Sequence, residues 1–128
     1  MTYAFRKARP DKNHAEIVGE LRGAGVYVED LRDTGGGVSD IVTYFGYKTV
    51  FIEIKHGAKA AVKKSQLKFL ATWKGHCGIA VDAESAIRLA KEPEKYALDS
   101  RQKDLLLVLW SKLEGKAIHL NTVLAAIK

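Results

Sequence analysis

Three charged residues in the middle of the chain have the types and spacing of a divalent-metal centre. Glu53 and Lys55 lie two positions apart in an apolar stretch, so a β-strand would point both side chains to one face. Asp40 begins the preceding apolar stretch, and a hairpin would bring it next to Glu53. Paired carboxylates bind a hard cation such as Mg²⁺, and the lysine adds a fixed positive charge. Such a centre suits phosphodiester hydrolysis.

The same three residues also have a simpler explanation. An aspartate at a strand start and a Glu and a Lys on one exposed strand face are common, and a cross-strand ion pair accounts for them. The surrounding pattern favours a metal centre, because a glycine loop precedes Asp40 and a basic helix with Gln66 follows Lys55. Gly36 and Gly37 in that loop would let the backbone of a nucleic acid approach without a Cβ in the way.

The hydrophobic pattern predicts an α/β fold with the order α-β-β-β-α-β-α. The expected helices are residues 12–22, 65–74 and 83–90, and the expected strands are residues 26–31, 39–45, 49–56 and 77–81. Residues 46–48 are short enough for a hairpin turn. The helix between the last two strands predicts a parallel pair with a right-handed crossover, and therefore a mixed central sheet. Asn13 and Glu16 form a predicted capping box, and Asp82 is expected to cap the third helix.

A helical C-terminal extension, residues 92–128, is expected to follow a core that ends at residue 91. Pro93 lies in a predicted linker, and helices are expected at residues 100–113 and 121–127, the second capped by Asn121. The apolar run 105–110 covers most of the circumference of the longer helix. That helix must therefore bury more than one face, against the core, a second subunit or both.

Length and composition set the class of protein. At 128 residues the chain has the length of one domain, and its 47% of hydrophobic residues can bury a core. Cys77 is the only cysteine, which excludes an internal disulfide and a cysteine-based zinc site. Residues 1–10 lack the apolar stretch of a signal peptide, and no apolar run is long enough to cross a bilayer. We expect a cytoplasmic protein without membrane contact.

The basic charge of the chain favours a polyanionic partner. The formal net charge is +6, and phosphate binding by Lys and Arg releases counterions. The residues expected to contact nucleic acid, besides the two glycines, are Lys12, Asn13, Lys59, Lys63 and Lys64. Any single lysine among them could equally be a solvated surface residue. The four histidines lack metal-ligand spacing, so zinc is not expected.

Three stretches resemble the virus-type replication-repair nuclease (VRR-NUC) family, a branch of the PD-(D/E)XK nucleases often carried by bacteriophages. They are DKNHAEIV at 11–18, GGGVSD at 35–40 and FIEIKHG at 51–57, and the resemblance covers about residues 6–90. Ser39 departs from the family pattern, in which a proline usually precedes the motif aspartate. That proline is structural, so its absence does not remove a chemical group.

The resemblance implies a restriction-endonuclease-like core and Mg²⁺- or Mn²⁺-dependent cleavage of DNA. Asp40 and Glu53 match the metal ligands and Lys55 matches the motif lysine, while the main-chain carbonyl of Ile54 and the side chain of Glu16 match further ligands. Small stand-alone members resemble Holliday junction resolvases and act as homodimers. The implied substrate is branched or flap DNA, read mostly through backbone and shape.

Several alternatives stay open at this point. Glu16 can bind the metal, complete the capping box, or do both. Gln66 can hydrogen-bond a metal-bound water or a phosphate, or pair with the backbone. Tyr44, Tyr47 and Phe51 can stack on bases or pack in the core. The competing functions are a catalytically silent nucleic-acid-binding module of the same fold and an assembly protein that oligomerises through its apolar tail.

Overall fold

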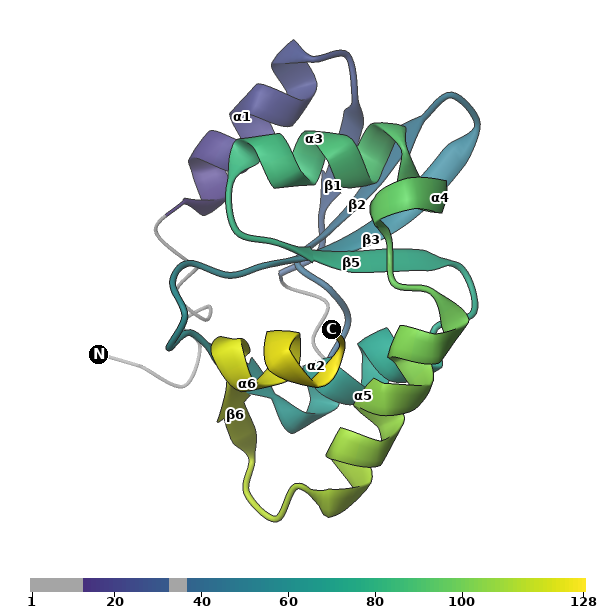
Figure 1. The fold of residues 1–128 in the computed structure, drawn as a ribbon. Coiled ribbons are helices and arrows are strands. Elements are labelled where there is room, and N and C mark those ends of the chain that lie inside the picture. Colours follow the sequence, from purple (N-terminus) through teal and green to yellow (C-terminus); the bar gives the residue numbers. More distant parts are fainter. Residues whose placement is uncertain (1–12, 33–36) are drawn as a thin grey trace, which may run out of the picture.

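A mixed β-sheet lies between two layers of helices (Figure 1). The computed structural model describes residues 13–32 and 37–128, so the expected roles of Lys12 and Gly36 lie outside the described residues. Helices α1 and α3 cover one face of the sheet, and α2, α5 and α6 cover the other. Within the described ranges, no helix has both the length and the apolar character that a membrane span requires.

The predicted α/β class with a mixed sheet is confirmed. The helices of this part are α1 (His14–Gly23), α2 (Lys64–Thr72) and α3 (Ala83–Lys91), and the strands are β1 (Tyr27–Asp30), β2 (Ile41–Phe45), β3 (Lys48–Ile54) and β5 (His76–Ala80). The strand order is β1-β2-β3-β5. The first two pairs are antiparallel, and β3 and β5 are parallel, as the intervening helix predicts.

A tight hairpin sets the register between β2 and β3. Gly46 and Tyr47 both have positive φ angles, 56° and 66°, which matches the left-handed turn that suits the twist of a two-residue hairpin. The sequence prediction placed Lys48 in the turn, whereas in the structure Lys48 is the first residue of β3. The register pairs Ile41 with Ile52, so Asp40, one residue before β2, lies opposite Glu53.

Three short elements differ from the sequence prediction. The strands β4 (Ala61–Lys63) and β6 (Ala117–His119) form a second, antiparallel sheet, and α4 (Pro93–Tyr96) occupies the expected linker. Strands of three residues are too short to show an alternating pattern, and proline suits the first turn of α4. Asn121 does not cap the last helix, because α6 (Leu120–Ala126) follows β6 directly and begins one residue earlier.

The C-terminal segment closes the second hydrophobic cluster of the protein. Helix α5 (Ser100–Lys112) packs against α2, and α6 packs beside α5. The buried members of this cluster are Val62, Leu67, Leu70, Ala71, Cys77, Leu106, Leu120, Val123 and Ile127. Leu107 and Val108 on α5 remain 41% and 50% exposed. Residues 92–128 therefore complete the helix layer to which α2 also belongs.

A chain that ends at Lys91 is expected to lose cooperative folding. The shortened chain lacks Leu106, Leu120 and Val123, each of which is at most 1% exposed in the full chain. Burial of one such side chain stabilises a fold by roughly 1.5–3 kcal/mol. The total free energy of unfolding of a domain is only about 5–15 kcal/mol. Thermal melting followed by circular dichroism checks this, with a chain lacking only the exposed Lys128 as control. A sharp melting transition of the shortened chain would contradict the prediction.

Candidate active site

The end of β3 places Glu53 and Lys55 on the side of the sheet that α2, α5 and α6 cover. Alternation along the strand turns Ile52 and Ile54 into the cluster beneath α1 and α3, and Glu53 and Lys55 to the opposite side. Glu53 is 1% exposed and Lys55 is 7% exposed. The simpler explanation of these residues requires a solvated strand face, whereas the structure buries both charged side chains.

Gln66, in the first turn of α2, contacts both buried side chains. Its Nε2 donates to Glu53 Oε2 at 2.7 Å, and Lys55 Nζ donates to its Oε1 at 3.1 Å. Lys55 Nζ also lies 3.2 Å from Glu53 Oε2. The backbone N–H of Lys63 donates to the same Gln66 oxygen at 2.9 Å, so Gln66 pairs with the backbone as well. The amide of Gln66 therefore fixes the Glu53 and Lys55 side chains relative to the start of α2.

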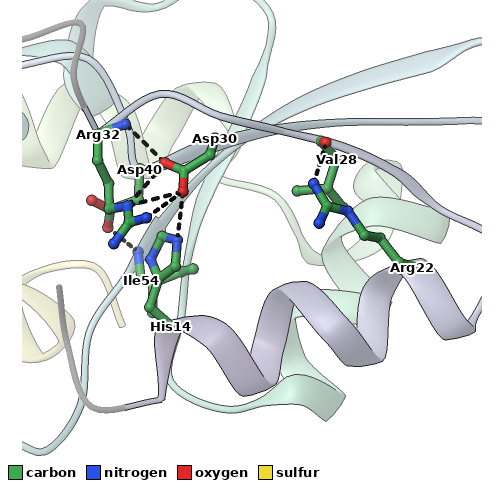
Figure 2. Close-up of polar contacts among 7 residues, drawn as sticks. All are labelled: His14, Arg22, Val28, Asp30, Arg32, Asp40 and Ile54. Atoms are coloured by element: carbon green, nitrogen blue, oxygen red, sulfur yellow. Dashed lines mark hydrogen bonds and ion pairs between the residues drawn. The ribbon is translucent and has the colours of Figure 1, made fainter.

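Asp40 is held against the end of β3. Its Oδ2 accepts a hydrogen bond from the main-chain N–H of Ile54 at 2.8 Å (Figure 2). Its carbonyl oxygen accepts from Leu31 N at 2.8 Å, which extends the β1–β2 pairing to the site. The side chain is half-buried and, by the strand register, on the same side of the sheet as Glu53. Asp40 and Glu53 thus form the adjacent carboxylate pair that the hairpin predicts.

Burial is the main cause of an unusual protonation equilibrium at Glu53. Burial first and the charge of Asp40 second raise the pKa of Glu53, Lys55 offsets part of this shift, and the net result is a pKa of about 8 instead of 4.5. A second negative charge at this point of the fold is therefore costly. A divalent cation bound to both carboxylates would remove that cost. Mg²⁺ commonly uses only one or two carboxylates and fills its other positions with water and phosphate oxygens, so the donors fit Mg²⁺ or Mn²⁺.

Comparisons with protein-family models, with curated proteins and with solved structures found no match. Any assignment of function therefore depends on the geometry and electrostatics of the residues themselves.

Glu16 does not join the carboxylate pair. It is exposed on α1, where it borders a shallow surface hollow with Glu20 and with Ile87 of α3. Among residues 13–32 and 37–128, no three side chains of His, Cys, Asp or Glu come together as metal ligands. The reason is the phase of the helix, because Ile17 and Val18 take the inward positions and turn Glu16 away. A role for Glu16 as completing ligand is not seen in this arrangement.

Asn13 connects the start of α1 to the site in a way the sequence did not indicate. The predicted capping box with Glu16 is wrong, because the Asn13 side chain turns to another element. Its Nδ2 donates to the carbonyl of Val81 at 2.8 Å and lies 3.5 Å from that of Lys55. Asn13 thereby ties α1 to the ends of β5 and β3. The predicted contact of Asn13 with nucleic acid has no support in these bonds to protein backbone.

A polar cluster at the end of β1, with one buried and two exposed members, escaped the sequence analysis. His14 is 4% exposed, and its Nε2 lies 3.4 Å from Asp30 Oδ2, which Arg32 Nη2 also approaches at 2.7 Å (Figure 2). Burial alone would raise the pKa of Asp30, but the hydrogen bonds and charge of Arg32, with His14, lower it to about 2. The cluster fixes the end of β1, where Leu31 binds Asp40. Only the Asp-x-Arg spacing could have indicated it from sequence.

Gly37 has a packing role. Its φ angle is +81°, and a Cβ added there would lie 2.7 Å from the carbonyl oxygen of Ser65 at the start of α2. Any other residue would combine an unfavourable backbone conformation with a clash. The glycine is therefore required for contact with α2, in addition to any approach of a nucleic acid.

The predicted phosphate-binding lysines divide into two groups. Lys63, directly before α2, and Lys59, before β4, are exposed. Lys64 is half-buried, and its Nζ donates to the carbonyl of Leu113 at 2.7 Å near the ring of Trp110. Lys64 thus joins α2 to the end of α5, and Lys59 and Lys63 are the two lysines of this set, among residues 13–32 and 37–128, that are exposed to solvent.

Of the aromatic residues that could stack on bases, Phe51 is used for packing. Its ring meets Phe69 and Trp73 edge-on, with centroids 5.4 Å and 4.8 Å away. Tyr44 and Tyr47 are 45% and 94% exposed and lie on the hairpin. For these two tyrosines both alternatives from the sequence stay open.

Proposed function

We propose that the chain is a divalent-metal-dependent endonuclease that hydrolyses phosphodiester bonds in DNA. The observation that carries the proposal is the buried Glu53, whose pKa is about 8 beside a second carboxylate, Asp40. A buried charged cluster of this kind contributes little stability compared with apolar residues of the same volume. Strongly shifted carboxyl groups are instead typical of sites that bind a cation or transfer a proton.

Each residue of the cluster has a role in this proposal. Asp40 and Glu53 hold Mg²⁺ or Mn²⁺, and the main-chain carbonyl of Ile54 is the expected further ligand. When bound, such a cation lowers the pKa of water and offsets charge on the phosphate. Lys55 stabilises negative charge on the scissile phosphate, and Gln66 orients the Glu53 and Lys55 side chains through its hydrogen bonds.

The fold and the charge of the protein support DNA as the substrate. The core elements follow each other in the order α-β-β-β-α-β-α, apart from the additional β4, and this order supports a restriction-endonuclease-like core as part of the proposal. The net charge of +6 favours a polyanion, and the exposed Lys63 lies next to the site, since its backbone N–H donates to Gln66. Contacts of this kind read backbone and shape, which suits branched or flap DNA. The proposal includes a homodimer that acts in the cytoplasm.

A cleavage assay of the full-length chain tests the proposal. Fluorescent duplex, flap, four-way-junction and single-stranded DNA are incubated with Mg²⁺, Mn²⁺ or EDTA, and sedimentation of the same protein tests the homodimer. Cleavage is expected with either metal and not with EDTA. Salt-sensitive DNA binding without any cleavage would support the catalytically silent binding module instead. In that case the contact between Lys55 and Glu53 would be a structural ion pair rather than part of a metal site. Failure of both cleavage and binding would favour an assembly protein.

A further inference from the structure

The second sheet, formed by β4 and β6, lies next to the candidate site. β4 ends at Lys63, whose backbone N–H donates to Gln66. The backbone N–H of Lys64 then donates to the carbonyl of Lys116 at 2.7 Å, and β6 follows at once. The register pairs Lys63 with Ala117 and Ala61 with His119. The C-terminal segment thus supplies a strand that lies directly beside the start of α2.

The outer face of this sheet consists of two alanines and two cationic or hydrogen-bonding side chains. Ala61 and Lys63 of β4 and Ala117 and His119 of β6 are exposed, whereas Val62 between them is buried. Because neighbouring residues of a strand alternate, these four side chains share one face. Lys63 and His119 are diagonal neighbours in the register, a relation that places residues about 7–8 Å apart.

This outer face has the chemistry of a phosphate-binding surface. Because the side chains of the two alanines are small, the backbone of a nucleic acid can come close to the sheet. Lys63 supplies a positive charge, and His119 supplies an N–H donor. Residues 57–65 and 115–122, which include both strands, contain no acidic side chain, and they add Lys59 and Lys116, both exposed. An anion is the ligand that this charge distribution complements.

We propose that the outer face of the β4–β6 sheet, formed by Ala61, Lys63, Ala117 and His119, binds the phosphodiester backbone of DNA next to the cleaved bond. The inference rests on the proposed nuclease function and assigns a binding role to residues 115–119. These residues belong to the C-terminal segment, which carries no catalytic residue. In this arrangement the β4–β6 sheet has two roles. Its Lys63 backbone N–H orients Gln66, and its outer face contacts the DNA.

Two substitutions test this surface through DNA affinity and its salt dependence. Ala117→Glu places a negative charge at the centre of the face and is expected to weaken binding about 10-fold at low salt. Lys63→Ala keeps the backbone N–H that Gln66 uses and is expected to reduce the slope of log K against log salt by about 1. Ala117→Gln has nearly the volume of the Glu variant without its charge and is expected to weaken binding less. Lys74→Ala, at the opposite end of α2, is the control for an exposed lysine.

The outcomes distinguish this inference from the nuclease proposal. If the wild type cleaves DNA but Ala117→Glu and Lys63→Ala bind with the affinity and salt slope of the Lys74→Ala control, the surface assignment is wrong and the nuclease stands. If cleavage is absent but these two variants lose affinity as expected, the surface stands and the catalytic proposal fails. Equal weakening by Ala117→Glu and Ala117→Gln would show that bulk rather than charge matters, and would also overturn the assignment. Thermal melting of each variant verifies that it is folded.

Discussion

Asp40→Asn and Lys55→Met are each expected to abolish metal-dependent DNA cleavage while the protein stays folded. Removal of one group that stabilises charge in a transition state typically reduces the rate about 10²–10³-fold. Asn at position 40 has the size of Asp and still offers an oxygen to the N–H of Ile54, but it is a poor ligand for Mg²⁺. Met at position 55 retains the apolar stem that passes through the buried site and removes the charge.

Single-turnover cleavage and thermal melting, measured on the same preparations, check this prediction. Asp104→Asn and Lys74→Met are matched controls, because both residues are exposed and lie outside the cluster. They are expected to cleave like the wild type. If Asp40→Asn and Lys55→Met cleave like these controls, the site has been assigned to the wrong residues. If both variants unfold instead, the carboxylates and Lys55 form a structural ion pair, which is the simpler explanation given from the sequence.

The elements that position Asp40 next to Glu53 could be predicted because their signals are local. Alternation along β3 placed Glu53 and Lys55 on one side, and the short turn at Gly46 fixed the hairpin. The parallel pairing of β3 with β5 followed from the helix between them. The strand faces and the hairpin need only a few neighbouring residues, and the parallel pairing needs only one intervening helix.

The burial of the site could not be predicted, because it depends on residues far away in the chain. The helix layer on the Glu53 side of the sheet is completed by α5, which begins at Ser100, and by α6, which begins at Leu120. The apolar run at 105–110 indicated that its helix must be buried, but a sequence pattern does not name the surface it packs against.

Side chains that choose a distant partner over a local one account for the other differences. Asn13 has the type and position of a helix cap, yet its amide bonds to the carbonyl of Val81, 68 residues away. His14 meets Asp30 from another element for the same reason. Capping and pairing rules describe local alternatives, and contacts with distant elements override them.

The second large effect concerns the stability of the metal-free protein, which is expected to fall as the pH rises from about 4.5 to about 8. In this range folded Glu53 keeps the proton that the unfolded chain has released, because its pKa is raised from 4.5 to about 8. The folded state therefore binds more protons, and raising the pH favours unfolding. The contribution of Glu53 is on the order of a few kcal/mol over the whole range. Urea unfolding at several pH values in EDTA measures it.

Glu53→Gln is the matched variant, because glutamine is the neutral isostere of the protonated carboxyl group. Near pH 6 it is expected to be about as stable as the wild type, and the pH-dependent loss assigned to Glu53 should be absent. Mg²⁺ should stabilise the wild type increasingly as the pH rises, by about 2.7 kcal/mol at 100 times Kd, and should not stabilise the variant. Identical pH profiles and equal responses to Mg²⁺ would show that Glu53 is not a metal ligand. The expected divergence arises because the charge that destabilises the empty fold is the charge that binds the cation, so stability and activity oppose each other at this residue.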